Sequence, residues 1–316
     1  MIKKFMLSSI GGDLSQSVAR CLREDYQNCH LIGLDIHKEH SGSIFVEELY
    51  LTVEANSENF LGSLSQLIAS NKPDFYFPLN DSELRIICNL KENEWYRVFG
   101  ETKVIWAGQK AIKAFSSKKI TSVFLNKIGV DTPKLYESSF LMRFNYPLIV
   151  KPNMGSGSKN IFLCQNYKEL KSSLNLVKDP IIQEYIPNSK SEYTVGVFAR
   201  NGGEVKSVTF RRNLSFGGNT SWCISTYEPE IEKISVKIAK AINLNGSINI
   251  QLRKHNDKYF IFEVNPRFSS TVYIRSMVGF RDVLWSTNEE FNYSKFEPAS
   301  IGSREFVTYN TASQLK

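Results

Sequence analysis

Two segments near the end of the chain, residues 247–252 and 259–265, alternate polar and apolar side chains with a period of two. That period is typical of β-strands that bury one face, and the short turn between them favours antiparallel pairing. Such pairing would gather the polar side chains on one face. These side chains are Asn249, Gln251, Glu263 and Asn265. Hard oxygen ligands of this kind suit Mg²⁺, with phosphates completing its shell, whereas a solvated polar face is the plain alternative.

A loop rich in glycine and serine, at residues 153–160, follows an apolar strand that ends at Lys151. Glycines let backbone amides approach an anion closely, and serine hydroxyls add donors, so the loop suits phosphate. It lacks the spacing of a P-loop, and by itself a plain turn explains it better. Lys151 favours the phosphate interpretation because it supplies a point charge next to the loop.

The first hundred residues alternate short apolar strands with amphipathic helices. The expected strands are at 5–7, 31–35 and 74–78, and the expected helices are at 14–22 and 61–68. This order indicates a parallel, Rossmann-like sheet. The Gly11-Gly12 turn does not follow the GxGxxG pattern, and Asp35 after the second strand does not by itself indicate a dinucleotide site.

Beyond residue 110 the pattern becomes richer in β-strands. A helical unit is expected at 111–130, with apolar positions at Ile120, Val123, Phe124 and Ile128. Further helices are expected near 167–176 and 231–242, and further strands at 147–151, 180–186, 193–198 and 205–210.

Composition narrows the classes of function. A chain of 316 residues can form two or three small cores, and its net charge of +7 suits nucleotide phosphates or an anionic substrate as well as nucleic acid. Basic residues occur as pairs rather than runs, so nucleic acid is the least favoured ligand. Five cysteines without CxxC spacing indicate reduced thiols, and four histidines without ligand spacing are expected at the surface. With no export signal or membrane span, we expect a cytoplasmic protein.

Residues 263–267, with the sequence EVNPR, resemble the E-[IV]-N-P-R signature of the ATP-grasp superfamily, and residues 246–251 resemble the matching strand of its carbamoyl-phosphate-synthetase-like branch. Residues 182–186 and 192–195 resemble the adenine hinge and ribose-binding segment of that family. The order of the segments is also that of the family, over roughly residues 110–280.

The resemblance implies an α/β and α+β fold, with a Rossmann-like domain at 1–110 and a two-lobed ATP-grasp module. Its small lobe would span 111–188, and its large lobe, with the metal site, 189–316. The implied activity is that of an ATP-dependent ligase, which activates a small-molecule carboxylate as an acyl phosphate and couples it to an amine. The implied cofactors are ATP and Mg²⁺, with Mn²⁺ as an alternative metal. A homodimer is also expected by resemblance, and a nucleotide-binding regulator or pseudoenzyme of the same fold is the alternative function.

The resemblance also implies roles for individual residues. ATP would contact Lys118, Lys151, Gly155, Ser156, Gly157, Ser158, Glu184, Tyr185, Ile186 and Glu192. Magnesium would be bound by Gln251, Glu263 and Asn265. The residues acting on the transferring phosphoryl group would be Lys151, Arg267 and one of the pair Arg211-Arg212, for which Arg212 is our candidate.

Three positions depart from the family pattern. Ser117 precedes the first lysine where an acidic residue is often found. Gln251 replaces the carboxylate of many branches, although the carbamoyl-phosphate-synthetase-like branch also has glutamine there. Ser269-Ser270 replaces the usual glycine pair. By resemblance, the first two would weaken metal affinity, and the third would reshape the substrate side.

Asp81 and Glu83 resemble a segment of the first domain that faces the cleft. A helix N-cap with an acidic first turn explains the two residues about as well.

Overall fold

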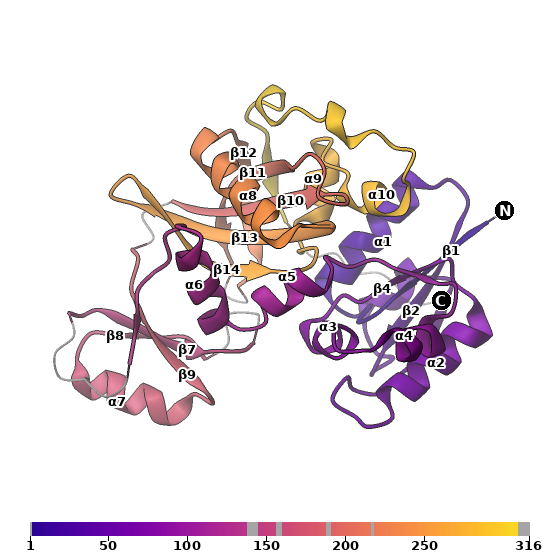
Figure 1. Cartoon of the computed structure of the whole chain (residues 1–316), viewed down its shortest axis with the longest axis horizontal. Helices are drawn as coiled ribbons and strands as arrows, with labels where there is room; N and C mark the ends of the chain where they lie inside the picture. Colours follow the sequence, from indigo (N-terminus) through magenta and orange to yellow (C-terminus); the bar gives the residue numbers. More distant parts are fainter. Residues whose placement is uncertain (1, 138–144, 156–159, 188–190, 216–217, 309–316) are drawn as a thin grey trace.

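The computed structural model describes residues 2–137, 145–155, 160–187, 191–215 and 218–308. Within these ranges the strands form three sheets, with helices packed between and around them (Figure 1). No helix in these ranges combines the length and the apolar character that a bilayer crossing requires.

The first sheet is parallel, with the strand order β3-β2-β1-β4-β5. Its strands are β1 (Lys3–Leu7), β2 (Cys29–Asp35), β3 (Glu48–Leu51), β4 (Phe75–Phe77) and β5 (Lys103–Val104). The segments between them form α1 (Asp13–Asp25), a 3-10 turn η1 (Ser41–Phe45), α2 (Phe60–Asn71), α3 (Asp81–Ile87) and α4 (Glu92–Phe99). The parallel sheet predicted for the first hundred residues is therefore observed, and β3 and β5 are additions to it.

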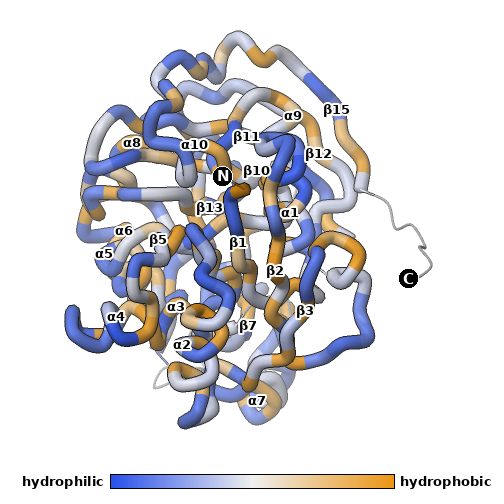
Figure 2. Tube along the Cα trace, turned by 90° about the vertical axis from the view of Figure 1, so that its right-hand side faces the viewer, coloured by the Kyte–Doolittle hydropathy of each residue, from blue (hydrophilic) through white to orange (hydrophobic). Residues whose placement is uncertain are grey.

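Apolar side chains cover both faces of this sheet, as parallel strands require. Phe5, Leu7 and Phe77 pack with α1 on one face, whereas Met6 and Tyr76 pack with α2 and α4 on the other. Figure 2 shows β1 changing from hydrophilic at its start to hydrophobic toward its end.

The second sheet is antiparallel, with the order β6-β9-β7-β8. Its strands are β6 (Leu135–Tyr136), β7 (Leu148–Pro152), β8 (Phe162–Cys164) and β9 (Pro180–Glu184). The helices of this region are α5 (Gln109–Ala114), α6 (Lys118–Lys127) and α7 (Tyr167–Leu176).

The helical unit predicted at 111–130 divides at Ser117, whose side chain caps α6 by accepting a hydrogen bond from the backbone N–H of Ile120. The apolar face expected for this helix is partly wrong. Ile120 and Val123 are 47% and 62% exposed, whereas Thr121 and Leu125 are buried. Thr121 tolerates burial because its hydroxyl donates to the Ser117 carbonyl at 2.8 Å.

The third sheet is antiparallel, with the order β14-β13-β10-β11-β12-β15. Its strands are β10 (Glu192–Ala199), β11 (Lys206–Leu214), β12 (Thr220–Thr226), β13 (Gly246–His255), β14 (Lys258–Asn265) and β15 (Glu305–Val307). The helices are α8 (Pro229–Ile242), α9 (Val272–Met277) and α10 (Asp282–Thr287), followed by the short turns η3 (Tyr293–Lys295) and η4 (Pro298–Ser300).

The first and third sheets are joined by a shared core. Phe268, Val272 and Val283, which follow β14, belong to the same apolar cluster as Phe5 and Val18 of the parallel sheet and α1. The mixed α/β class is confirmed by this arrangement. The Rossmann-like domain, the two-lobed layout and the domain boundaries at 110 and 188 remain predictions.

Candidate functional site

A cavity of about 250 Å³ lies between the second and third sheets, and we call it the central cavity. It is lined by every predicted site residue that the structure describes, except Tyr185: Lys118, Lys151, Gly155, Glu184, Ile186, Glu192, Arg212, Gln251, Glu263, Asn265 and Arg267. Ser156, Gly157 and Ser158 lie outside the described residues. The fold thus gathers segments that are far apart in the chain.

Arg212, and not its neighbour Arg211, faces the central cavity. The Arg211 guanidinium instead lies 5.7 Å from the centre of the Trp222 ring. Successive side chains of a strand point to opposite faces, so only one member of the pair can reach the cavity. Of the two arginines, Arg212 is therefore the one that lines the central cavity, and its role there remains a prediction.

Lys118 is the first residue of α6, directly after its Ser117 cap. Its Nζ donates to the Gly155 carbonyl at 2.9 Å and lies 3.9 Å from Glu263 Oε1. The serine found where the family often has an acidic residue therefore has a structural role, because its hydroxyl starts the helix that presents Lys118.

Lys151 is 5% exposed on β7, with its Nζ 5.8 Å from the centre of the Phe262 ring. Burial lowers the pKa of Lys151 to about 8, and the charge of Glu263 opposes this shift. A buried ammonium held at this pKa is still mostly protonated at neutral pH. It can therefore present a positive charge to an anion inside the cavity.

Glu192 connects two arginines beneath the central cavity and is 1% exposed. Its Oε1 accepts from Arg212 Nη2 at 3.0 Å, and its Oε2 accepts from Arg253 Nε and Nη2 at 2.9 and 2.8 Å. Arg212 Nη2 also donates to Gln251 Oε1 at 2.9 Å. The network fixes the orientation of these side chains, since buried charges are stable only when they are paired.

Arg253 is a cavity-lining residue that the sequence interpretation missed. Its Nη1 donates to the Ile186 carbonyl at 2.9 Å, which ties the segment after β9 to β13. The signal was present in the sequence. Arg253 follows Gln251 by two residues in the same strand, and side chains two residues apart share a face.

The predicted hairpin of β13 and β14 is observed, with Gln251 paired to Glu263 and Asn249 paired to Asn265. Asn249, however, does not join the polar set that faces the cavity. It is fully buried, and its Oδ1 accepts hydrogen bonds from Thr194 Oγ1 and Arg275 Nη2. The expectation that all four polar side chains converge is therefore wrong for Asn249.

Among the described residues there is no cluster of three or more His, Cys, Asp or Glu side chains that could hold a metal by themselves. A divalent cation in the central cavity would therefore depend on the carboxylate of Glu263, on amide oxygens and on oxygens of a bound ligand. This donor set consists of hard oxygens, which fits Mg²⁺ or Mn²⁺.

Arg267 and Asp81 form a bidentate ion pair at the edge of the central cavity. Arg267 Nε donates to Asp81 Oδ1 at 2.9 Å, and Nη2 donates to Oδ2 at 3.0 Å. Burial acts to raise the pKa of Asp81, but the charge of Arg267 lowers it overall. Asn80 caps α3 by accepting from the Glu83 backbone N–H at 2.8 Å. The N-cap interpretation is therefore confirmed, because Asp81 lies in the first turn of a capped helix. Its carboxylate also contacts the predicted site residue Arg267, and a role for Asp81 in the cleft remains a prediction.

The charges that line the central cavity are unbalanced. The cations are Lys118, Lys151, Arg212, Arg253 and Arg267, and the carboxylates are Glu184, Glu192 and Glu263. This surplus of positive charge suits a polyanionic ligand.

The position of the site agrees with the match to known families. Residues 115–271 match the model of the ATP-grasp domain. We therefore assign residues 115–271 to the ATP-grasp domain family, as the motifs predicted.

Curated relatives include carbamoyl phosphate synthases. The large chain from Helicobacter pylori (strain ATCC 700392 / 26695) is 25% identical over 196 residues, which are 54% of this chain and 18% of the relative. The carbamoyl-phosphate synthase of Methanobrevibacter smithii is 24% identical over 233 residues, which are 68% of this chain and 62% of the relative. The chain therefore corresponds to only part of these proteins.

Solved structures share the fold over most of the chain. N5-carboxyaminoimidazole synthetase from Staphylococcus aureus, complexed with ADP, has a TM-score of 0.70 at 17% identity. The aligned part covers 92% of this chain and 78% of the synthetase chain. Biotin carboxylase from Campylobacter jejuni has a TM-score of 0.68 at 15% identity, and the aligned part covers 90% of this chain and 70% of the carboxylase chain. At these identities the likeness concerns the fold alone.

Proposed function

We propose that this protein is an ATP-dependent ligase, which activates a small-molecule carboxylate with Mg²⁺-ATP and joins it to an amine. The single observation that supports this proposal is the gathering of Lys118, Lys151, Glu263 and Arg267 around one cavity. Positioning and charge neutralisation are the main demands of phosphoryl transfer, and these residues can meet both.

The two lysines would hold the phosphates of ATP. Lys118 is anchored at the start of α6, and Lys151 is enclosed on β7. Gly155 and the loop that follows it in the sequence would cover the phosphates. Arg212 and Arg267 would stabilise the charge on the transferring phosphoryl group, because both are fixed by carboxylate partners.

The adenine would lie against the segment at 184–186. The Glu184 N–H already donates to the Lys134 carbonyl at 2.8 Å, so Glu184 would offer its carbonyl oxygen to the base. The Ile186 carbonyl accepts from Arg253, so Ile186 would offer its N–H. Tyr185 lies between them in the chain but does not line the cavity. Glu192 would accept from the ribose hydroxyls.

Glu263 and Asn265 would hold the divalent cation, with Gln251 beside them. When bound, Mg²⁺ would offset the negative charge on the phosphate oxygens. Gln251 Oε1 is already used as an acceptor by Arg212, so we assign it a weaker contribution than Glu263.

The reaction would proceed in two displacements. A carboxylate oxygen attacks the γ-phosphorus, the bond to the β–γ bridging oxygen breaks, and ADP leaves with that electron pair. The amine nitrogen then attacks the acyl carbon, phosphate leaves with the C–O electron pair, and the nitrogen releases a proton. Enclosure of the site would protect the acyl phosphate from water.

The test is a phosphate-release screen that pairs amino acids, hydroxy acids and sugar acids with amines in the presence of Mg²⁺-ATP. Phosphate should form only when both substrates are present. Glu263→Gln should reduce turnover at least about 100-fold by removing the carboxylate ligand. Glu58→Gln, at an exposed position, is the matched control and should leave turnover unchanged. Full turnover in Glu263→Gln would contradict the metal assignment.

The alternative is a nucleotide-binding regulator of the same fold. It is favoured by one observation, which is that Gln251 offers an amide already bonded to Arg212 in place of a metal-binding carboxylate. ATP binding with no phosphate release across the whole screen would support this alternative over the ligase.

A further inference from the structure

Arg253, on β13, is held from three sides in the lining of the central cavity. Its Nε and Nη2 donate to Glu192 Oε2 at 2.9 and 2.8 Å, and its Nη1 donates to the Ile186 carbonyl at 2.9 Å. Its guanidinium carbon lies 5.3 Å from the centre of the Phe262 ring. These contacts fix the orientation of the side chain, because a guanidinium is planar and presents its donors in a rigid fork.

Glu192 is a rigid anchor for Arg253. The two residues are direct partners in the ladder between β10 and β13, and Glu192 is 1% exposed. Its other oxygen, Oε1, accepts from Arg212 Nη2 at 3.0 Å, and Arg212 lies on the neighbouring strand β11. Turning the carboxylate away would leave two arginines without a buried partner, which is costly. Arg253 therefore presents Nη1 to Ile186 from a fixed position.

The carbonyl of Ile186 is occupied by this contact, whereas its N–H is available. Ile186 lines the central cavity just after β9 and is 5% exposed. In the part of the chain that the structure describes, no backbone carbonyl accepts from the Ile186 N–H. Ile186 therefore offers a hydrogen-bond donor to a ligand and withholds its acceptor.

Glu184 shows the opposite arrangement, with its N–H occupied and its carbonyl available. The Glu184 N–H donates to the Lys134 carbonyl at 2.8 Å, next to the ladder between β6 and β9. An antiparallel ladder would return the Lys134 N–H to the Glu184 carbonyl. That N–H instead donates to the side-chain Oε2 of Glu184 at 3.1 Å. The Glu184 carbonyl therefore remains as an acceptor in the cavity lining.

An acceptor on Glu184 and a donor on Ile186 match one edge of adenine. The N6 amino group of adenine donates, and its N1 accepts. Guanine and hypoxanthine carry the reverse pattern, because their O6 accepts and their N1–H donates. These bases would need the Glu184 N–H and the Ile186 carbonyl, which Lys134 and Arg253 already occupy. A base left with unpaired polar groups in an enclosed site is strongly rejected.

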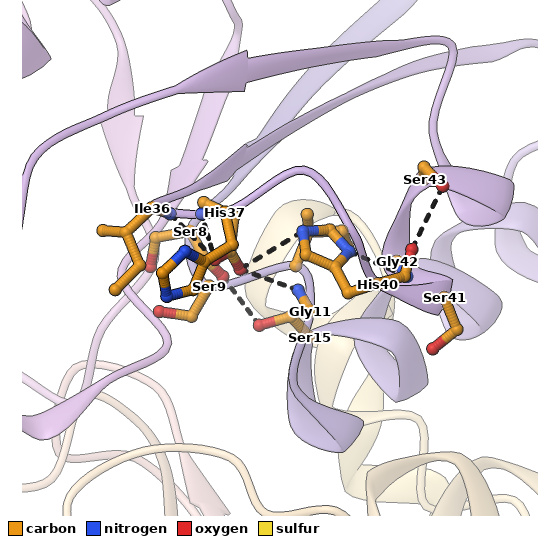
Figure 3. Close-up of polar contacts among 12 residues, drawn as sticks. Ser8, Ser9, Gly11, Ser15, Ile36, His37, His40, Ser41, Gly42 and Ser43 are labelled. Carbon is orange, nitrogen blue, oxygen red and sulfur yellow. Dashed lines mark hydrogen bonds and ion pairs between the residues drawn. The ribbon is translucent and has the colours of Figure 1, made fainter.

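The glycine turn of the parallel sheet is filled by the protein's own side chains. A Cβ built on Gly11 would lie 2.9 Å from His40 Cδ2 and 3.1 Å from Asp35 Oδ2, and Asp35 accepts from the Gly11 N–H at 2.8 Å. Figure 3 shows the His40 ring between Gly42 and the loop that contains Gly11. His40 is 13% exposed, which corrects the expectation that the histidines lie at the surface. The central cavity is therefore the better place for a nucleotide base.

We propose that Arg253 makes the central cavity selective for adenine over guanine and hypoxanthine, by occupying the Ile186 carbonyl that the N1–H of these two bases would need. The inference rests on the proposed function, because it requires a nucleotide in the central cavity. Arg253 acts through Ile186 and is therefore a positioning residue.

Isothermal titration calorimetry of the full chain with Mg²⁺ and ADP, GDP or IDP tests this proposal without a carboxylate substrate. IDP has the O6 and N1–H of GDP but lacks its 2-amino group, so it reports on this edge of the base alone. The wild type should bind ADP at least about 100-fold more tightly than IDP or GDP. In Arg253→Met the Ile186 carbonyl is released, so the preference for ADP over IDP should shrink at least about tenfold.

Two further variants separate selectivity from folding. Arg253→Lys keeps a cation beside Glu192 but lacks the planar fork that reaches both Glu192 and Ile186. It should unfold near the wild-type melting temperature and still lose most of the preference for ADP over IDP. Arg97→Met, at an exposed position, should bind all three nucleotides as the wild type does.

The ratio of the two affinities distinguishes selectivity from a structural role. A structural role for Arg253 would weaken ADP and IDP equally, so an unchanged ratio in both Arg253 variants would overturn the proposal. Equal binding of ADP and IDP by the wild type would overturn it too, while leaving nucleotide binding in place. No binding of any of the three nucleotides by the wild type would contradict the proposed function itself, and this inference with it.

Discussion

Arg267 donates through Nε and Nη2 to the two carboxylate oxygens of Asp81, at 2.9 and 3.0 Å. Arg267 lies just after β14, whereas Asp81 begins α3 beside the parallel sheet. The pair therefore links the first sheet to the edge of the central cavity. In the proposed reaction, Asp81 is a positioning residue because it acts through Arg267.

Asp81→Asn should lower kcat by about tenfold while the KM for ATP stays within about threefold, because the guanidinium loses its charged partner but remains in place. Asp81→Glu should recover part of the loss, which a purely structural role in α3 would not predict. Steady-state kinetics measures both constants. The control is Asp257→Asn, at a side chain that is 99% exposed. A change in the KM for ATP alone would argue against positioning of the phosphoryl-transfer step.

Lys151→Met should weaken ATP binding by at least about tenfold while raising the melting temperature of the free protein. Burial lowers the pKa of Lys151 to about 8, so keeping it charged at pH 7 costs stability. The sign follows from proton counting. Between about pH 8 and the ordinary lysine pKa the unfolded chain binds more protons, so the wild type gains stability with rising pH, and Lys151→Met lacks this gain.

Calorimetric titration with ATP and thermal unfolding at pH 7 and pH 9.5 measure the two effects of Lys151→Met. Lys119→Met, at the exposed residue beside Lys118, should change neither quantity. A melting temperature that falls in Lys151→Met at pH 7 would show that the buried lysine stabilises the fold, contrary to this account.

Glu83 should make the free protein less stable as pH rises from about 5 to 8. Burial raises the pKa of Glu83 to about 8 from its ordinary value. Over this interval the folded state keeps a proton that the unfolded state releases, so rising pH favours unfolding. The Glu83→Gln variant has no carboxyl group to titrate at this position. Its melting temperature should therefore rise relative to that of the wild type as pH increases.

Thermal unfolding of wild type and Glu83→Gln between pH 5 and 8.5 measures this difference, with Glu58→Gln as the exposed control. Parallel pH profiles for wild type and Glu83→Gln would mean that Glu83 titrates normally.

The strands that carry the candidate site could be predicted because their signals are local. The alternation in β13 and β14 predicts the antiparallel hairpin, in which Gln251 pairs with Glu263. A register shift next to this pair interrupts the alternation in β14, so Phe262 and Glu263 both line the central cavity, which the alternation does not predict. The same alternation cannot tell which polar residue is covered by a later helix. Asn249 is bonded to Arg275 of α9, which the local pattern does not reveal.

Other features of the fold and of the candidate site could not be predicted because they depend on tertiary contacts. The apolar spacing of α6 predicts a helix, but burial of Thr121 and Ser122 depends on hydrogen bonds to Ser117 and Thr132. The Asp81–Arg267 pair joins residues 186 positions apart, and nothing in either segment specifies the partner. The cavity at the carboxyl ends of β1 to β4 likewise forms only when several loops meet.

The most direct test of the central claim is a crystal structure of the protein with Mg²⁺ and a non-hydrolysable ATP analogue. The account predicts phosphates in contact with Lys118 and Lys151, a metal ion on Glu263, and the base beside residues 184–186. A nucleotide bound elsewhere, or bound here with its phosphates pointing away from both lysines, would contradict it.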